Sequence, residues 1–483
     1  MISWPTIVHL LGYFVLGVTV FLTVPLGLAL WEGDGGTWPL LVALLSGLAA
    51  GGAGGFAFRP KPHEINRREG ILFVVLAWVV LVTLGALPYF FSPHFPGFTD
   101  AFFESISGFT TTGATILLDI EGLPRSLLLW RALTHWFGGM GIILLGIAIL
   151  PLLGTGGMEL YRAEFSGAHS EKLKPRIAET ALALWKIYVA FTLAEYVALR
   201  WAGMTSFDAV CHSFATMATG GFSTKAASIE SFQSPAIEYV IIIFMILAGI
   251  NFTQHYRLFV ERNARSFLRD PEIRYYALGI VLAVVAISIS LMSYSATSIS
   301  ESFRQSLFQV VSIITTTGFS SVDFELWPAF GTFVLLVLMF IGGCTGSTAG
   351  GMKTARIVML LNVVGREFKR MVERRGVFAV RFGGRAVSEG TVASVLNLVY
   401  LAFIINFIAC LTLTAAGLDL MTAFSAVVAS MFNIGPGLGS VGPAENYAHL
   451  PGLVKWVLSF CMLAGRLEFY TVLVIFTPMF WRK

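Results

Sequence analysis

Charged residues are scarce in this chain. Only 12% of its 483 residues are Asp, Glu, Lys or Arg, whereas 56% are hydrophobic. Soluble domains carry about 25% charged residues, so this scarcity excludes a soluble protein. A membrane β-barrel would read as alternating segments of roughly 10 residues, whereas the apolar runs here reach the roughly 20 residues that a helix needs to cross a bilayer. We therefore expect an all-α polytopic membrane protein.

Cysteine and catalytic patterns are also scarce. Cys211, Cys344, Cys410 and Cys461 lie far apart in apolar segments without a CxxC pair, and the eight histidines have no ligand spacing. Neither a zinc site nor a disulfide framework is therefore predicted. An intramembrane hydrolase, the enzymatic alternative, would need an HExxH or a nucleophile–base arrangement, and none is visible. We expect no catalytic residues and no enzyme.

Ten long apolar runs predict membrane-spanning helices. They cover residues 7–30, 38–58, 70–92, 127–153, 177–203, 236–260, 274–295, 329–364, 390–416 and 451–480. The first run lacks a positively charged start and a cleavage site, so we expect it to be retained. Four shorter segments, of about 10 to 13 residues, cannot span a bilayer and are predicted to be pore half-helices. They are Thr99–Phe109, Ser206–Met217, Ser302–Ile314 and Met421–Met431.

This alternation of long and short segments occurs four times. It predicts two leading helices in residues 1–68, followed by helix–pore loop–helix repeats in residues 69–176, 177–270, 271–388 and 389–483. Repeated units of this size indicate a pseudo-fourfold architecture around one ion pore. An inverted-repeat secondary transporter is disfavoured because all four units share one orientation.

A short turn that ends in glycine follows each half-helix. The four turns are Thr110-Thr111-Thr112-Gly113, Ala218-Thr219-Gly220-Gly221, Thr315-Thr316-Thr317-Gly318 and Phe432-Asn433-Ile434-Gly435. Glycine kinks could recur by chance among 49 glycines, but position, half-helix and sidedness agree four times. In the second turn, either glycine could match the others. Gly221 is favoured because Gly221-Phe222-Ser223 aligns with Gly318-Phe319-Ser320.

The residue types in these turns suit a monovalent cation. Glycine lets the backbone adopt unusual dihedral angles, so that carbonyl groups can point at a central ion. Rings of carbonyls replace the water shell of potassium, whereas calcium or magnesium calls for carboxylates. No Asp or Glu occurs in the four turns. A potassium path is therefore predicted ahead of a sodium path. The fourth turn differs most, so we expect weaker discrimination than four identical turns would give.

Basic residues cluster in the loops on one side of the predicted spans. They are Arg59, Lys61, Arg67 and Arg68; Arg162, Lys172, Lys174 and Arg176; Arg257, Arg262, Arg265, Arg269 and Arg274; Arg366, Lys369, Arg370, Arg374, Arg375, Arg381 and Arg385; and Arg482 and Lys483. The opposite side is more acidic, with Asp119, Glu121, Glu230, Glu238, Asp323, Glu325 and Glu445. The positive-inside rule places the basic side and both termini in the cytoplasm. The glycine turns then face outward, beneath an acidic rim that concentrates cations.

A glycine-rich stretch interrupts the predicted span 329–364. Its candidate gate residues are Gly342, Gly343, Cys344, Thr345, Gly346, Ser347, Gly350, Gly351 and Lys353. A polar break at membrane depth must line a cavity, which favours a mobile gate under the turns. A glycine face for close helix packing is one alternative. A phosphate-binding loop is another, but Met352 intrudes before Lys353-Thr354 and the stretch follows an apolar span.

Arg466 is a charge predicted to lie inside the membrane. In a continuous span, the roughly 15 residues to Trp481 would place it about 22 Å from the cytoplasmic end. We interpret Arg466 as a fixed charge that faces the pore and impedes cations. The alternative is an arginine that pairs with a neighbouring helix for structure alone. Other polar residues in or near spans are expected to fill packing or interfacial roles: Lys186, Glu195, Arg131, His135 and His255.

Together these features resemble the TrkH/TrkG/KtrB family of bacterial potassium-uptake proteins over essentially the whole chain. The residues that carry the resemblance are the four turns, Gly342–Thr354 and Gly465-Arg466-Leu467-Glu468. The two leading helices favour the TrkH branch over KtrB. The resemblance implies one filter glycine per repeat, here Gly113, Gly221, Gly318 and Gly435, and a gating role for the glycine-rich stretch.

The resemblance also implies the setting of the protein. We expect potassium as the transported ion, the bacterial cytoplasmic (inner) membrane as the location, and a homodimer with one pore in each chain. A cytosolic nucleotide-binding regulatory ring, TrkA-like, is the expected partner, and this chain itself is expected to bind no nucleotide. The basic loop Arg366–Arg385 could bind that partner or anionic lipid. A proton- or sodium-coupled symporter is the alternative to a gated channel-like path.

Overall fold

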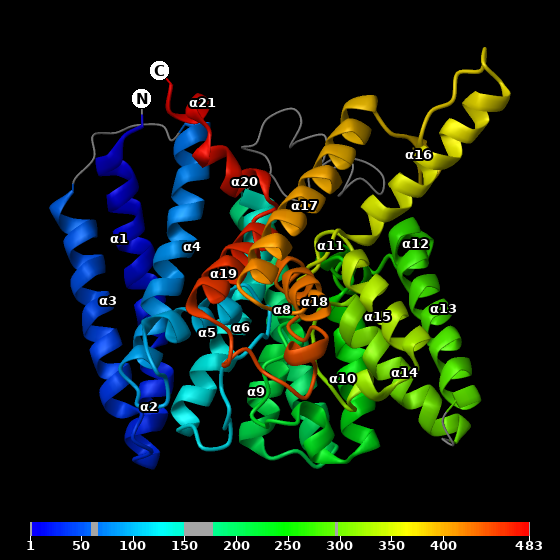
Figure 1. Ribbon diagram of the computed structural model, residues 1–483. Coiled ribbons are helices and arrows are strands. Elements are labelled where there is room, and N and C mark those ends of the chain that lie inside the picture. The colour runs from blue at the N-terminus through cyan, green and yellow to red at the C-terminus, as the bar shows by residue number, and fades with distance from the viewer. Residues whose placement is uncertain (1, 59–65, 149–176, 295–297, 483) are drawn as a thin grey trace.

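The computed structural model describes residues 2–58, 66–148, 177–294 and 298–482. The predicted basic residues Arg59, Lys61, Arg162, Lys172, Lys174, Arg176 and Lys483 lie outside these ranges, as does the end of the span 127–153. The described residues form an almost entirely helical protein (Figure 1). The only strands among them are β1 (Arg381–Phe382) and β2 (Arg385–Ala386), which pair antiparallel in one short hairpin. The predicted all-α fold is confirmed.

The longer helices build the scaffold. They are α1 (Trp4–Phe21), α2 (Thr23–Glu32), α3 (Thr37–Ala57), α4 (Arg67–Phe90), α6 (Arg125–Ala148), α8 (Ile177–Trp201), α10 (Pro235–Ala248), α13 (Pro271–Tyr294), α15 (Ala329–Ile341), α16 (Thr354–Val372), α17 (Glu389–Ala415) and α19 (Gly452–Arg466). Shorter helices are α11 (Phe252–Phe259), α12 (Ala264–Arg269), α20 (Tyr470–Leu473) and α21 (Pro478–Trp481). The 3-10 turns are η2 (Ser228–Phe232), η3 (Phe324–Leu326), η4 (Gly439–Val441) and η5 (Val474–Phe476).

Four further helices match the predicted half-helices. They are α5 (Phe98–Phe109), α9 (Ser206–Met217), α14 (Ile299–Ile314) and α18 (Leu420–Met431). Each ends at the predicted residue. Three of them begin at a capping side chain, because Thr205, Ser298 and Asp419 each accept a hydrogen bond from a backbone N–H of the first turn. All four are too short to cross a bilayer, so they reach only part of its depth.

The outward faces of the long helices are strongly apolar. On α13, for example, Val281, Leu282, Val285 and Ile289 are each at least half exposed. Six described helices are long and apolar enough to span a membrane, or eight if each of two bent pairs counts as one span. Exposed apolar faces of this extent suit lipid and not water. The protein is therefore a multi-pass membrane protein, and both termini lie at the same end of the bundle (Figure 1).

Two predicted spans are not continuous helices, because the chain bends sharply within them. The span 236–260 is broken between α10 and α11, at an angle of 99°. Asn251 starts the new helix there, since its side chain accepts from Thr253 N. The span 451–480 is broken after Arg466, at 112°. Arg466 and Trp481 therefore do not lie on one continuous helix, and the distance predicted between them along a helix does not apply. The predicted break in the span 329–364 is confirmed, because α15 ends at Ile341 and α16 begins at Thr354.

Candidate ion-conduction site

The four glycine turns share one unusual backbone conformation. The second residue of each turn has a positive φ although it is not glycine: Thr111 (54°), Thr219 (54°), Thr316 (56°) and Asn433 (55°). The glycine two residues later is also left-handed, with φ of 84° at Gly113, 80° at Gly221 and Gly318, and 102° at Gly435. Such a conformation costs a non-glycine residue on the order of 1 kcal/mol or more, so it persists only where the surroundings enforce it. The same conformation is enforced in all four repeats.

The turns close into a ring, which we call the four-turn ring (residues 110–113, 218–221, 315–318 and 432–435). A Cβ added to Gly113 would lie 2.2 Å from the carbonyl oxygen of Gly220. The other contacts follow in order: Gly221 with Thr317 O at 2.1 Å, Gly318 with Ile434 O at 1.9 Å, and Gly435 with Thr112 O at 2.7 Å. Each glycine thus adjoins the carbonyl before the next glycine. Gly221, not Gly220, occupies the position of the other three.

Side-chain hydrogen bonds connect residues within and between the turns. The hydroxyls of Thr110 and Thr112 lie 2.8 Å apart, and those of Thr315 and Thr317 lie 2.7 Å apart. In the fourth turn, Asn433 Nδ2 donates to Thr112 Oγ1 at 3.0 Å and to Met462 O at 3.0 Å. The asparagine therefore joins the last turn to the first.

The glycine-rich stretch, residues 342–353, lies directly against the ring. Gly350 N donates to Thr316 Oγ1 at 2.6 Å, and Gly351 N donates to Phe432 O at 3.1 Å. A Cβ on Gly350 would lie 2.1 Å from Phe432 O, so only glycine fits there. The stretch also contacts the break between α10 and α11 in the second repeat, where Cys344 N donates to Gly249 O at 2.8 Å. We call residues 342–353 the glycine-rich loop.

The remaining predicted gate residues hold the loop in shape. Gly342, Gly346 and Gly351 have φ of 79°, 72° and 75°. Thr345 is tied to Glu272 of α13, whose Oε1 accepts from Thr345 N at 2.7 Å and from Ala355 N at 3.1 Å. The other ties are local: Thr354 N donates to Gly343 O, Ser347 Oγ to Cys344 O, and Lys353 Nζ to Ala349 O.

Arg466 ends α19 next to the loop and is buried, with 3% of its surface exposed. Its Nη1 donates to Thr348 O at 2.9 Å, and its Nη2 donates to Gly138 O of α6 at 3.1 Å. Its Nε has no hydrogen-bond partner in the described part of the chain. Glu468 does not pair with Arg466 but with Arg356 of α16, at 2.9 Å. The guanidinium of Arg466 thus bridges the loop and the first repeat.

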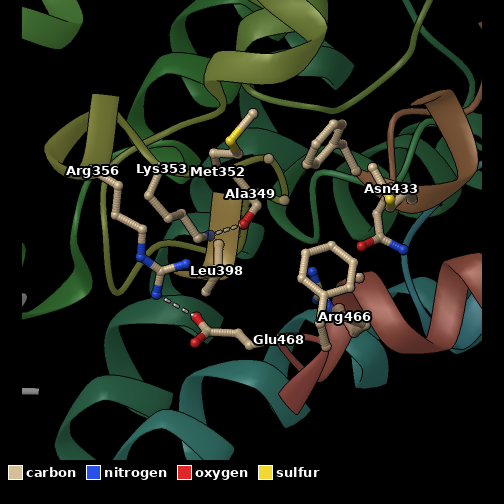
Figure 2. Close-up of a pocket in the computed structure, with 14 residues that line it drawn as sticks. Ala349, Met352, Lys353, Arg356, Leu398, Asn433, Arg466 and Glu468 are labelled. Atoms are coloured by element: carbon tan, nitrogen blue, oxygen red, sulfur yellow. Dashed lines mark hydrogen bonds and ion pairs between the residues drawn. The ribbon is translucent and has the colours of Figure 1, made fainter. Parts of the chain in front are cut away.

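The loop, the fourth turn and the break after α19 together line a cavity of about 50 Å³. Figure 2 shows Lys353 and Arg356 on one side of it, with Asn433 and Arg466 on the other. Leu398 of α17 also lines the cavity. A space of this size holds a few water molecules. No group of three or more His, Cys, Asp or Glu that could hold a metal ion occurs among the described residues.

Comparison with known proteins gives one consistent result. The family described as "TrkH: Cation transport protein" matches residues 43–483. The chain belongs to the TrkH family. It is 43% identical to the Trk system potassium uptake protein TrkH of Vibrio parahaemolyticus and 43% identical to that of Escherichia coli K12, over 99% of each chain. The crystal structure of the potassium transporter TrkH from Vibrio parahaemolyticus matches with a TM-score of 0.91 and 41% identity, covering 100% of both chains.

In this TrkH-family chain, one functional candidate escaped the sequence prediction. Arg131 and Glu104 form a fully buried ion pair, with Nε and Oε1 2.8 Å apart. Glu104 also accepts from Ile116 N at 3.0 Å, while Arg131 Nη1 donates to Ser223 O at 3.1 Å. The guanidinium lies 3.9 Å from the centre of the Phe222 ring. The pair therefore ties the chain after the first turn to the chain after the second.

A signal for this pair was present in the sequence. Glu104 lies six residues before Thr110, and the same position in the next two repeats holds His212 and Gln309. His212 Nε2 lies 2.9 Å from Ser223 Oγ, and Gln309 Nε2 donates to Val322 O at 3.3 Å. Three repeats thus carry a buried polar side chain that braces the chain beyond the turn. Aligning the half-helices and not only the turns would have found it.

Proposed function

We propose that this chain takes up potassium across the bacterial cytoplasmic membrane, through the four-turn ring. The observation that carries the proposal is the ring itself, in which four turns with one enforced backbone conformation meet in cyclic order. The family and the relatives named as potassium uptake proteins support the choice of ion. Potassium is the cargo, and the proposal includes no resident cofactor.

The proposed filter consists of backbone carbonyls and threonine hydroxyls. Its residues are Thr110, Thr111, Thr112, Gly113, Ala218, Thr219, Gly220, Gly221, Thr315, Thr316, Thr317, Gly318, Asn433, Ile434 and Gly435. The carbonyls take the place of water around the ion. The four half-helices end directly before the turns, so the negative ends of four helix dipoles adjoin the ring and favour a cation there.

The proposed gate lies beneath this filter. The glycine-rich loop contacts the third and fourth turns, and the Arg466 guanidinium donates to the loop carbonyl of Thr348. A fixed positive charge so close to the ring repels a cation leaving it. In this arrangement, flow requires the loop and Arg466 to move together.

An ion-coupled symporter is the second candidate, and one residue favours it. Glu195 of α8 is fully buried inside the membrane-spanning part. No Lys or Arg of the described residues pairs with it. A carboxyl group at membrane depth without a cationic partner is a candidate for reversible proton binding. If coupling occurs, Glu195→Gln abolishes proton movement with potassium while the filter stays intact.

The proposed setting follows from charge and family. Basic residues at the beginning of α4 and on α12 and α16 support a cytoplasmic location for both termini under the positive-inside rule. The relatives' names place them in a "Trk system", which supports a cytosolic nucleotide-binding, TrkA-like partner. We extend the proposal to a homodimer in which each chain has its own pore.

Rubidium uptake into liposomes that contain the purified protein tests the function. Potassium should compete strongly for uptake and sodium weakly. Gly113→Ser and Gly318→Ser should abolish this preference, because a side chain at either position meets a carbonyl oxygen within 2.2 Å. Gly52→Ser is the matched control, since nothing lies within 4 Å of a Cβ there. Unchanged competition in both filter variants would refute the assignment.

A further inference from the structure

Two helix breaks, one between α15 and α16 and one between α19 and α20, face each other across the cavity beneath the ring. One is the end of the glycine-rich loop at Lys353, and the other is the segment after Arg466, where α19 turns into α20 (Figure 2). Lys353, Glu468 and Phe469 have φ of 74°, 58° and 39°. Side chains other than glycine adopt this region only under constraint. The surrounding structure therefore constrains the backbone at both breaks.

An ion pair joins these two breaks. Arg356 lies in the first turn of α16, directly after the loop, and its Nη2 is 2.9 Å from Glu468 Oε1. Arg356 is almost fully buried, whereas the Glu468 side chain is 37% exposed. The pair thus lies at the edge of the cavity, where water and a change in charge can reach it. Breaking it removes the carboxylate that the buried guanidinium faces.

The segment 466–468 is consequently tied to the loop region at two points. Arg466 donates to Thr348 O, which precedes Lys353 in the sequence. Glu468 pairs with Arg356, which follows Lys353. The first tie is a buried hydrogen bond to a carbonyl, and the second is an ion pair within reach of solvent.

We propose that the Arg356–Glu468 ion pair is a latch that holds the glycine-rich loop and the α19–α20 break in the closed arrangement. The latch rests on the proposed function, because it positions the gate and touches no ion. Opening of the gate separates the two side chains, so a chain without the latch spends more time open.

Rubidium flux through reconstituted protein tests the latch. Glu468→Gln and Arg356→Gln should each raise the maximal flux about fivefold or more, the range of coupling between linked elements. The half-saturating concentration and the potassium–sodium competition should not change, because the ring is untouched. The charge-swapped chain, Arg356→Glu with Glu468→Arg, should return the flux toward the original value.

A second ion pair on the same helix supplies the matched control. Arg366 Nη1 lies 2.5 Å from Glu389 Oε1 and joins α16 to α17, outside the cavity lining. Glu389→Gln should leave the flux unchanged. An equal rise in Glu389→Gln, or no rise in either latch variant, would overturn the proposal. A charge-swapped chain that behaves like the single variants would overturn it as well.

Thiol labelling gives a readout that does not depend on the filter. Ala349→Cys places a thiol in the cavity lining. It should react with a water-soluble reagent faster in the Glu468→Gln background than alone, whichever ion is present. Equal rates would refute the latch. Loss of ion selection is read separately, from Gly113→Ser and Gly318→Ser, so a failure of the filter and a failure of the latch are distinguishable.

Discussion

The first and fourth repeats have the same ring backbone but opposite surroundings. Behind the first turn lies the buried Arg131–Glu104 pair. In the fourth repeat, the position of Glu104 holds Ala426, and Gly437 replaces Thr115, which binds Glu104 in the first repeat. The fourth turn instead contacts the glycine-rich loop through Phe432 O. One side of the ring is fixed by charge, and the other adjoins the elements that we propose to move.

Helices α6 and α19 show the same difference between the first and fourth repeats at a single position. A Cβ on Gly138 would lie 1.9 Å from Phe109 O, and one on Gly465 would lie 1.8 Å from Met431 O, so the two glycines pack alike on the ends of α5 and α18. The next residue is Gly139 in the first repeat and Arg466 in the fourth. At this position the fourth repeat carries a charge and the first does not, so the two repeats differ directly below their turns.

Removing the Arg131–Glu104 ion pair should have the largest effect on stability. Arg131→Ala leaves the Glu104 carboxylate buried without its cation, a loss of about 3–5 kcal/mol. We expect a large fall in melting temperature, measured by size-exclusion chromatography after heating. Arg125→Ala is the control, because the exposed Arg125–Glu32 pair contributes at most about 1 kcal/mol. Equal falls in melting temperature in the two variants would show that the Arg131–Glu104 pair does not distinguish the first repeat from the fourth.

Substitution of a ring glycine should alter ion selection more in the first repeat than in the fourth. Gly113→Ala places a methyl group 2.2 Å from Gly220 O, on the braced side, whereas Gly435→Ala places one 2.7 Å from Thr112 O, on the side of the loop. We expect Gly113→Ala to lower the potassium–sodium preference by about tenfold, since strain of this kind costs about 1–3 kcal/mol. Gly435→Ala should lower it less. Competition against rubidium uptake measures both, and the reverse order would contradict the contrast.

Neutralising the charge under the fourth repeat should raise flow without altering selection. Arg466→Ala removes the barrier and the bond to Thr348, so maximal rubidium flux should rise several-fold. Arg466→Lys keeps the charge and serves as the control. If Arg466→Ala left the flux of folded protein unchanged, the arginine would be structural and not a barrier.

The smallest expected effect concerns the acidic rim that the sequence predicts on the outer side. Burial raises the pKa of Glu325, as do the nearby charges of Asp323 and Glu445, although the hydrogen bond from Gly439 N opposes this. Its carboxylate therefore gains a proton at a higher pH than an ordinary glutamate. Because its pKa is raised in the folded protein, protonation stabilises the fold and does not weaken it.

Lowering the pH on this side from neutral should then reduce uptake slightly at low salt, since the raised pKa of Glu325 lets its negative charge disappear at a higher pH than that of an ordinary glutamate. Glu325→Gln should remove that part of the pH dependence. Added salt should mask the effect in the original chain. A pH dependence that is identical in Glu325→Gln would assign it to other groups.

Much of the architecture could be predicted from local sequence. The ends of the four half-helices, the positions of the turns and the break before Thr354 depend on nearby residues, because short apolar segments and glycines act locally. The choice of Gly221 rested on the two residues after it, and its backbone matches that of the other three glycines.

Other features were decided by the tertiary structure alone. Arg131 and Glu104 are 27 residues apart, and Arg131 and Ser223 are 92 apart. No local pattern marks such contacts. The break after Arg466 contains Leu467, Glu468 and Phe469, none of which favours a turn. Glu468 and Phe469 have positive φ there, and Glu468 pairs with the distant Arg356, so the folded chain decides where the last span bends.

The positions of the four turns were determined by the sequence itself, because each turn needs a glycine as its fourth residue. Their cyclic order was decided only in the tertiary structure, where each glycine meets the carbonyl of the next repeat. The same holds for the contact between loop, ring and Arg466. These groups come from distant parts of the chain, and close packing of backbone on backbone brings them together.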